Sequence, residues 1–400
     1  MCALNGYRGC VTTAPGPTVL DAASLLCEVA DELVVRTVRD THTAWVDRVY
    51  GVGRLATRAE SPSLGERAHR GIASAVYAGV GGGLRLASTG LDRVAATGRG
   101  PHLESTTEGR FVSSAVNGLI GDRLLRERPQ MAIPMAVRHA GADVDPTPEE
   151  LGAAFPEASG RLVVFLHGLC ENESYWQRHR DRTGTTYAEE LAERGWTPLM
   201  LRANTGLPLR ENGAALTGLM QQVVEAWPVP VERIALVGHS MGGLVIRAAG
   251  AVAADVEEPW SSKVSDVVTL GTPHLGAPIA WGIGHGSRGL GVLPETAAFG
   301  RLLDWRSAGV HDLVAGLAED VPPLPHARYR LVAATLTESQ RHPVGHLVGD
   351  LLVRPRSAYG RDRKGRELFP GAEVLHVGRT DHFGLLNHPE VREALRRWLS

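Results

Sequence analysis

The first 130 residues carry apolar side chains at helical spacing. One stripe, with an apolar or small residue every three to four positions, runs as far as Val49 and predicts a long helix. Thr18 and Asp21 have the spacing of an N-terminal capping box, in which each side chain accepts from a backbone N–H of the other residue. We expect Gly51 and Gly53 to end this helix, because glycine is common where helices stop.

Two more helices are predicted in this region. One begins after Ser63 and carries small residues that let another helix approach closely, at Gly71, Ala75, Gly79 and Gly83. The other has Ser105 and Glu108 as its cap and an inner face formed by Phe111, Ala115, Leu119 and Ile120. Residues 1–130 are therefore expected to form a helical region that carries no catalytic chemistry. Packing as a bundle and contact with a lipid surface or a protein partner are both open interpretations.

After residue 130 the pattern changes to short apolar runs that alternate with helical segments. The runs predict strands over 132–138, 162–166, 198–202, 234–237, 264–270, 329–334 and 373–377. Strands separated by helices indicate an α/β domain over 131–400, with a mostly parallel sheet covered by helices on both faces. Because such sheets bind their ligands at the carboxyl ends of the strands, the functional residues are expected there.

The segment 277–325 interrupts this alternation. It begins with closely spaced glycines and continues with apolar residues at helical spacing. We expect an excursion from the sheet here, which is either a lid over the site or a fixed addition to the core.

Composition and charge narrow the range of functions. The 400 residues include 42 basic and 44 acidic side chains, so the net charge of −2 removes the attraction on which nucleic-acid binding depends. Four cysteines without a Cys-x-x-Cys pair predict neither a disulfide framework nor a zinc site. The polar, glycine-rich start lacks the apolar core of a signal peptide, and no apolar run is long enough to predict a transmembrane helix. A cytoplasmic location is expected.

The pattern Gly-x-Ser-x-Gly occurs at 238–242, with Ser240 in the middle. Four apolar residues precede it as a predicted strand, and an apolar helical pattern follows it. This context is typical of a sharp strand-to-helix turn that lifts a nucleophilic serine clear of the sheet, with glycines where neighbouring segments pass closely. The alternative, a glycine-rich turn with an incidental serine, is disfavoured by the flanking strand and helix.

A serine hydroxyl is a poor nucleophile unless a histidine takes its proton and a carboxylate orients that histidine. His382 follows the last predicted strand and is the candidate base. Asp350, which adjoins an apolar segment after the preceding strand, is the first candidate for the orienting acid, and Glu338 is the reserve candidate. Asp381 is next to His382 in sequence, a spacing that is awkward for aligning the ring.

The oxyanion of a tetrahedral intermediate needs two backbone N–H donors. Met241, directly after the serine, is expected to supply one of them. Leu169, in the loop after the strand at 162–166, is expected to supply the other. His167 is interpreted as structural, and Cys170 as a loop or pocket residue, since no surrounding motif would lower the pKa of its thiol.

A metal site is the competing hypothesis for one part of this set. His342, His346 and Asp350 are each four residues apart, which is the spacing of ligands on one helix face. Pro343 disfavours a helical conformation at His342, and nearby glycines weaken a helix further. No metal or cofactor is therefore expected.

Five motifs occur in order along the chain, namely FLHGL at 165–169, LVGHSMGGLVIR at 236–247, LGTPHLGAP at 270–278, GDLLV at 349–353 and DHFGLL at 381–386. Together they resemble the α/β-hydrolase superfamily, and within it the lipase-like esterases of the GPI inositol-deacylase type. The resemblance covers residues 131–400 and implies a carboxylic-ester hydrolase without a cofactor, in which the region over 277–325 is lid-like. It implies Ser240 as nucleophile, Asp350 as acid and His382 as base, with Leu169 and Met241 forming the oxyanion hole.

The substrate class that this resemblance implies is a small-molecule or lipid ester. Two other functions use the same residues or the same fold. One is an acyltransferase, in which another hydroxyl replaces water, and the other is a catalytically silent binding protein. The intact set of three candidate catalytic residues argues against the silent protein, whereas the sequence does not separate a hydrolase from an acyltransferase.

Overall fold

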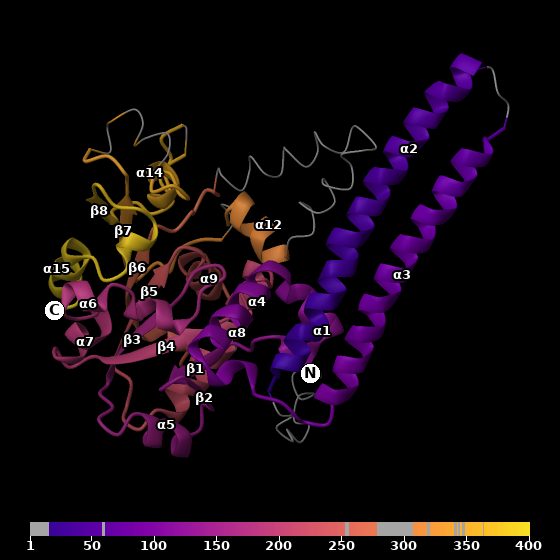
Figure 1. The fold of residues 1–400 in the computed structure, drawn as a ribbon. Coiled ribbons are helices and arrows are strands. Elements are labelled where there is room, and N and C mark those ends of the chain that lie inside the picture. Colours follow the sequence, from indigo (N-terminus) through magenta and orange to yellow (C-terminus); the bar gives the residue numbers. More distant parts are fainter. Residues whose placement is uncertain are drawn as a thin grey trace. The chain divides into compact units, whose positions relative to one another are not determined.

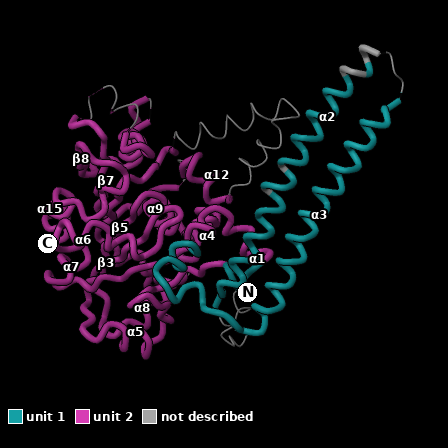
Figure 2. Tube along the Cα trace, viewed as in Figure 1, with its two compact units in different colours: residues 1–113, 128–131, 283–305 teal, residues 114–127, 132–282, 306–400 magenta. Residues whose placement is uncertain are grey.

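The structure is a computed structural model that describes residues 16–57, 61–252, 256–277, 307–317, 321–339, 342, 345, 349–362 and 364–400. The chain divides into two compact units. The first unit comprises residues 1–113, 128–131 and 283–305, and the second comprises residues 114–127, 132–282 and 306–400 (Figure 2). Residues 114–127 precede the predicted division at residue 130 but belong to the second unit.

Long helices dominate the first unit (Figure 1). α1 (Val19–Val29) continues through a π-helical turn, η1 (Ala30–Val35), into α2 (Arg36–Thr57), and α3 (Leu64–Ala95) follows. Within the described residues of the whole chain, no helix combines the length with the apolar content that crossing a bilayer requires.

Two of the helix boundaries predicted from the sequence are found in this unit, and a third is not. The predicted capping box is confirmed, because Thr18 accepts from the Asp21 N–H while the Asp21 carboxylate accepts from the Thr18 N–H. Ser63 caps α3 as predicted. The predicted helix end at Gly51 and Gly53 is wrong, since α2 runs on to its last residue at position 57. Neither glycine has the left-handed backbone that commonly ends a helix.

Ion pairs connect the helices of the first unit. Arg54 of α2 and Arg70 of α3 both contact the carboxylate of Glu66, at 2.5 and 2.9 Å. Arg85 of α3 contacts Asp31 of η1 at 2.8 Å. Many large apolar side chains of the same helices are exposed instead, among them Leu26, Val34, Val38, Trp45, Val49, Leu64, Ile72, Val76, Val80, Leu86 and Val94.

An eight-stranded sheet forms the framework of the second unit, in the order β2-β1-β4-β3-β5-β6-β7-β8. Its strands are β1 (Ala136–His139), β2 (Ala142–Val144), β3 (Arg161–Leu166), β4 (Thr197–Arg202), β5 (Arg233–His239), β6 (Val264–Leu270), β7 (Arg328–Ala334) and β8 (Glu373–Val377). β1 pairs antiparallel with β2 and β4, and all other neighbours pair in parallel. The predicted mostly parallel sheet is confirmed.

Every predicted strand is present, with two differences at one edge of the sheet. The first strand begins at Ala136 rather than at residue 132. β2 has no signal in the sequence, because three residues are too few to show the alternation of a strand. The turn that joins β1 to β2 has positive φ angles at Ala140 and Gly141, and it directs the chain back along β1.

The side chains of β3 alternate between two apolar cores, one on each face of the sheet. Leu162, Val164 and Leu166 pack in a core with residues of α8 (Leu209–Ala226) and α9 (Met241–Gly250). Val163 and Phe165 pack in a core with residues of α7 (Tyr187–Ala192) and α15 (Pro389–Trp398). The predicted cover of helices on both faces is therefore confirmed (Figure 1).

Shorter helical elements complete the described chain. They are α5 (Pro148–Ala154), α6 (Arg180–Thr183), α12 (Ala308–Ala315), α14 (Pro355–Ala358), and the 3-10 turns η2 (Leu103–Ser105), η3 (Pro129–Met131), η4 (Glu173–Gln177), η5 (Trp260–Lys263) and η6 (Phe383–Leu385).

The helix α4 (Thr107–Glu127) differs from its prediction in its cap and in its inner face. Its first turn is capped by Thr106, whose hydroxyl accepts from the Gly109 N–H at 3.0 Å. Phe111 and Leu119 are exposed, although the sequence places them on the inner face. The buried side is formed instead by small and polar residues together with two larger apolar ones, namely Ser113, Ser114, Asn117, Gly118, Ile120, Gly121 and Leu124.

The inner face of α4 consists largely of small residues because its backbone lies close to neighbouring segments of the chain. A Cβ atom on Gly118 would overlap the Cys170 sulfur, and one on Gly121 would overlap the side chain of Asn204. Glycine is therefore required at both positions, and the backbone of α4 reaches the loops that follow β3 and β4.

The predicted excursion over 277–325 falls mainly on residues 278–306 and 318–320, which lie outside the described residues. Its described part contains α12, where Leu313 packs in the apolar core on the α8 and α9 face of the sheet. Leu317 and Val321 belong to the same core. A lid-like role for this segment stays a prediction.

Candidate active site

Ser240 lies in a sharp turn between β5 and α9. Its backbone has φ 52° and ψ −122°, a conformation that is strained for any residue other than glycine. The turn is held at both sides, because the Ser240 N–H donates to the Leu270 carbonyl at 2.8 Å and the Ser240 carbonyl accepts from the Gly243 N–H at 3.2 Å. A Cβ on Gly242 would overlap the Leu166 carbonyl, which explains the second glycine of the motif.

His382 and Asp350 come from loops that follow neighbouring strands, β8 and β7. The His382 Nδ1 donates to the Asp350 Oδ2 at 2.8 Å. Both residues are buried, with exposed fractions of 2% and 1%. The His382 Nε2 is buried too and has no hydrogen-bond partner among the described residues. With Nδ1 carrying the proton, a neutral ring presents the lone pair of Nε2 to a nearby donor.

The backbone fixes the Asp350 carboxylate. Its Oδ1 accepts from the N–H groups of Leu352 and Val353 at 3.0 and 2.8 Å. Gly349 and Leu351 have positive φ angles, so the chain turns sharply on both sides of the aspartate. The Asp350 carbonyl also accepts from the His382 N–H at 3.0 Å, which joins the two loops directly.

The other candidate acids lie elsewhere. Glu338 is exposed and contacts the exposed guanidinium of Arg379 at 2.7 Å. Asp381 is exposed, and its carboxylate accepts from the Gly384 N–H at 2.7 Å.

The end of β6 lies against both Ser240 and His382, and among the described residues no hydrogen bond joins the Ser240 hydroxyl to the His382 ring. Leu270, the last residue of that strand, accepts from the Ser240 N–H. The next residue is Gly271, where a Cβ would come within 3.0 Å of the His382 ring. One short stretch of chain thus contacts both the serine turn and the histidine.

The loop after β3 lies directly against the serine, because a Cβ on Gly168 would come 2.9 Å from the Ser240 Cβ. Three of its backbone N–H groups are engaged: Gly168 donates to Glu171 Oε2, Cys170 to Thr205 Oγ1, and Glu171 to the Gly168 carbonyl. The Leu169 N–H has no acceptor among the described residues, and neither has that of Met241. These are the two predicted oxyanion donors.

The order of these elements along the chain is typical of one fold. A parallel sheet carries a strained serine turn after β5, an acid after β7 and a histidine after β8. The protein has an α/β-hydrolase fold.

Comparison with known protein families gave one match. Residues 156–281 match a family described as "Putative serine esterase (DUF676)". This range contains Ser240 and both predicted oxyanion donors, and it ends before Asp350 and His382. The match supports ester hydrolysis. A search of curated protein sequences gave no significant match.

Several solved structures are similar to this chain at low identity. The mature lipase BlEst2 of Bacillus licheniformis is 20% identical with a TM-score of 0.42, and the match covers 60% of this chain and 92% of that one. The carboxylesterase CesB of Bacillus subtilis is 14% identical with a TM-score of 0.37, over 72% and 97% of the two chains. At such low identity these structures do not identify a substrate.

Two residues of the loop after β3, His167 and Cys170, have simple structural roles. The His167 Nδ1 donates to the Gly168 carbonyl at 2.9 Å, and its Nε2 accepts from the Ala203 N–H at 3.1 Å. Burial lowers the pKa of His167, so its ring is neutral and ties two loops together. Burial raises the pKa of the Cys170 thiol to about 11, which disfavours the thiolate that a nucleophile needs.

The competing metal hypothesis gains no support from the described residues. His346 lies outside them. Both carboxylate oxygens of Asp350 are engaged, one by His382 and the other by backbone N–H groups. Among the described residues, no group of three or more His, Cys, Asp or Glu side chains could hold a metal ion.

No role is predicted from the sequence for Glu171 or for His239, the histidine before the serine. The structure brings them together, with 2.9 Å between Glu171 Oε2 and His239 Nδ1. No local sequence pattern connects them, because they lie 68 positions apart in the chain.

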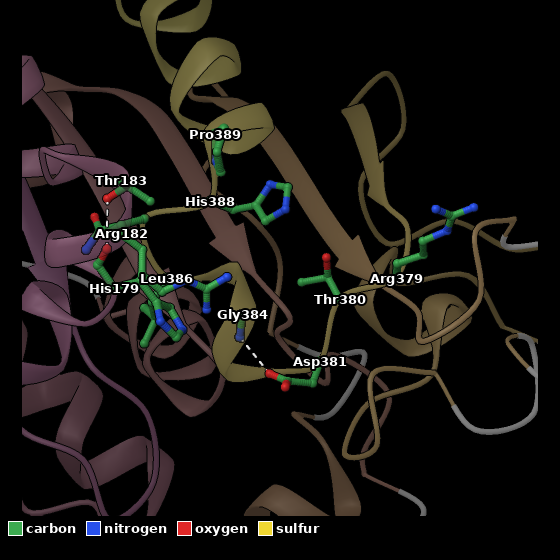
Figure 3. Close-up of a pocket in the computed structure, with 11 residues that line it drawn as sticks. His179, Arg182, Thr183, Arg379, Thr380, Asp381, Gly384, Leu386, His388 and Pro389 are labelled. Carbon is green, nitrogen blue, oxygen red and sulfur yellow. Dashed lines mark hydrogen bonds between the residues drawn. The ribbon is translucent and has the colours of Figure 1, made fainter.

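A cavity of about 440 Å³ lies beside the loop that carries the histidine (Figure 3). Residues of 379–389 line one side of it, and His179, Arg182 and Thr183 line the other. Its lining does not include Ser240, Asp350 or His382. The cavity therefore adjoins the candidate active site without containing the reacting groups.

Proposed function

We propose that this α/β-hydrolase is a serine hydrolase that cleaves carboxylic esters through an acyl-enzyme intermediate. Ser240 is the nucleophile, His382 the base and Asp350 the orienting acid. The observation that carries the proposal is the 2.8 Å hydrogen bond from His382 Nδ1 to Asp350, which leaves a buried and unpartnered Nε2 on the ring. A strained serine in the turn before α9 adds to this support.

The first half of the reaction forms the acyl-enzyme. The Ser240 Oγ attacks the ester carbonyl while His382 Nε2 takes its proton, and the Asp350 carboxylate stabilises the resulting imidazolium. The carbonyl oxygen becomes an oxyanion, to which the Leu169 and Met241 N–H groups donate. When the tetrahedral intermediate collapses, the bond to the alkoxy oxygen breaks and His382 returns the proton to the departing alcohol.

The second half releases the acid. Water attacks the acyl carbon while His382 Nε2 takes one of its protons. The bond between the acyl carbon and Ser240 Oγ then breaks, and the serine recovers its proton from His382. These steps need no cofactor. An alcohol in place of water would make the same site an acyltransferase.

A lipid-like ester is the substrate class that we propose, and the helices of the first unit support it. Ile72, Val76 and Val80 lie four residues apart on α3 and are exposed. On the same helix, Glu66, Arg70 and Arg85 pair with residues of η1 and α2. The charged side chains are thus paired between helices, whereas the apolar side chains are exposed. Exposed apolar side chains favour contact with a lipid surface, because they leave water there.

The experiment that tests the function measures hydrolysis of p-nitrophenyl esters from acetate to palmitate. Wild type is compared with Ser240→Ala and with Ser262→Ala, which changes an exposed serine far from the turn in sequence. We expect Ser240→Ala to lose at least about a thousandfold in kcat, because the nucleophile is gone, and Ser262→Ala to match wild type. The preferred chain length then reports the size of the acyl pocket.

Two results would contradict the proposal. Turnover that persists in Ser240→Ala would place the reaction on another residue. Absence of Ser240-dependent turnover on every ester, with the protein folded, would leave an acyltransferase that needs its own acceptor or a binding role.

A further inference from the structure

A buried ion pair lies directly behind the proposed reacting groups. His239, the last residue of β5, is fully buried, and Glu171, from the loop after β3, has an exposed fraction of 4%. The carboxylate Oε2 lies 2.9 Å from the ring Nδ1. Moving two charged groups from water into the protein interior costs free energy, and apolar side chains at the same positions would not have this cost. A contribution to stability therefore does not by itself explain the pair.

Both nitrogens of the His239 ring face acceptors. Nδ1 faces the Glu171 carboxylate, and Nε2 lies 3.2 Å from the backbone carbonyl of His382. A carbonyl oxygen only accepts, so both contacts are fully satisfied when the ring carries two protons. Burial opposes that charge, but the attraction and the hydrogen bond of Glu171 outweigh it and raise the pKa of His239.

The Glu171 carboxylate has a second donor in the oxyanion loop. Its Oε2 accepts from the Gly168 N–H at 2.7 Å. Burial opposes ionisation of this carboxyl too, yet the charge and hydrogen bond of His239 and the Gly168 N–H outweigh burial and lower the pKa of Glu171. Because the Gly168 N–H is taken, the turn presents the Leu169 N–H as its available donor.

We infer that His239, as an imidazolium paired with Glu171, is a positioning residue that fixes three loops of the active site relative to one another. Its own backbone precedes Ser240 in the nucleophile turn. Its Nδ1 holds the oxyanion loop through Glu171, and its Nε2 holds the backbone of His382. The inference rests on the proposed function, since it concerns the same site.

Without the Glu171–His239 pair, we expect the reacting groups to lose their alignment. Removing the charge of either partner leaves a buried donor or acceptor without its match. The three loops must then relax, and small displacements of reacting groups cost large factors in rate. The titratable groups that face the His239 ring are Glu171, His382 and Asp350. The His239 ring also contacts the aromatic rings of Trp176 and Phe383.

The test compares His239→Gln, Glu171→Gln and the double variant in the full-length protein on a short p-nitrophenyl ester. His274→Gln is the matched histidine control, because His274 is as buried as His239 and burial lowers the pKa of its ring to about 3. Glu190→Gln is the matched carboxylate control, because Glu190 is buried and pairs with Arg396.

We expect kcat to fall at least about tenfold in both site variants while KM stays within about threefold, since alignment matters most in the transition state. The controls should keep kcat within about threefold of wild type. The double variant should lose no more than the worse single variant, because the two residues act as a unit.

A measurement on the wild-type protein tests whether His239 is an imidazolium, even if a variant does not fold. In ¹⁵N-histidine NMR titrations of wild type, one imidazole should stay doubly protonated to a higher pH than an ordinary histidine, whose pKa is about 6.5. Absence of that signal, or a kcat within about threefold of wild type in both folded site variants, overturns the inference. Ser240→Ala separates the two claims, because missing Ser240-dependent turnover counts against the proposed function while the NMR signal still tests the pair.

Discussion

Ser240 combines an unfavourable backbone with an ordinary side chain. A non-glycine residue at φ 52° costs on the order of 1–3 kcal/mol. Hydrogen bonds at its own N–H and carbonyl hold it in place, and glycines at 238 and 242 let other chain segments pass. The sequence predicts this turn well, because the strand, the glycines and the helix are all local signals.

The sequence alone could not decide which carboxylate orients the histidine. Asp350 and Glu338 both follow β7, and only the three-dimensional path of the chain brings Asp350 to His382. Asp350→Asn should lower kcat by about 10³–10⁴-fold with the fold retained, because an amide does not stabilise the imidazolium or hold the correct tautomer. Steady-state kinetics beside Glu338→Gln checks this, and a large loss in Glu338→Gln with Asp350→Asn active would reassign the acid.

The Glu171–His239 pair predicts a pH-dependent stability. The pKa of Glu171 is lowered by folding, so its contribution is present above the ordinary carboxyl value of about 4.3 and is lost as pH falls. The pKa of His239 is raised, so its contribution is complete below about 6.5 and is lost as pH rises through the raised value. The difference in Tm between wild type and Glu171→Gln should therefore be largest near pH 6 and shrink toward pH 9. A constant difference over that range would contradict the ion pair.

At the scale of elements, α4 shows how close approach can replace apolar packing. Its pattern predicts an inner face around Phe111 and Leu119, both of which are exposed. Gly118 and Gly121 face the loops after β3 and β4 instead, where no side chain fits. A sequence pattern of apolar residues cannot reveal a face that is selected for being small.

Gly118→Ala tests this role of α4. The added methyl group would meet the sulfur and backbone of Cys170, so we expect a loss of about 1–3 kcal/mol in the free energy of unfolding and a lower kcat through the displaced oxyanion loop. Gly218→Ala in α8 is the matched control, because nothing lies within 4 Å of the added atom there. It should be neutral or stabilising by up to about 1 kcal/mol. Denaturant unfolding compares them, and equal effects of the two changes would refute the packing argument.

The exposed apolar face of α3 makes a second element-scale prediction. Full-length wild type should float with phosphatidylcholine–phosphatidylglycerol vesicles, because burial of Ile72, Val76 and Val80 in the lipid interface removes apolar surface from water. Changing all three to serine should weaken flotation. Val374→Ser, at an exposed valine of β8, should not. Flotation that is absent in wild type, or unchanged in the triple variant, would count against lipid contact.

At the scale of the whole molecule, the sequence predicts the sheet far better than the first unit. Strands β3 to β7 are apolar runs that are mostly buried on both faces, so their signal is local and strong. β2 has only three residues, and α2 continues through two glycines that its pattern would place at a helix end. The Glu171–His239 pair also lacks a sequence signal, because its partners are 68 positions apart and only the sheet brings them together.

The most direct test of the central claim, that Ser240 is an activated nucleophile, is covalent labelling by diethyl p-nitrophenyl phosphate followed by peptide mass spectrometry. A phosphoryl group should attach to Ser240 with release of one p-nitrophenol per chain, because His382 removes the serine proton and the oxyanion donors receive the phosphoryl oxygen. His382→Ala should label far more slowly, and Ser240→Ala should not label. Labelling of a different residue, or of no residue in a folded protein, would contradict the account.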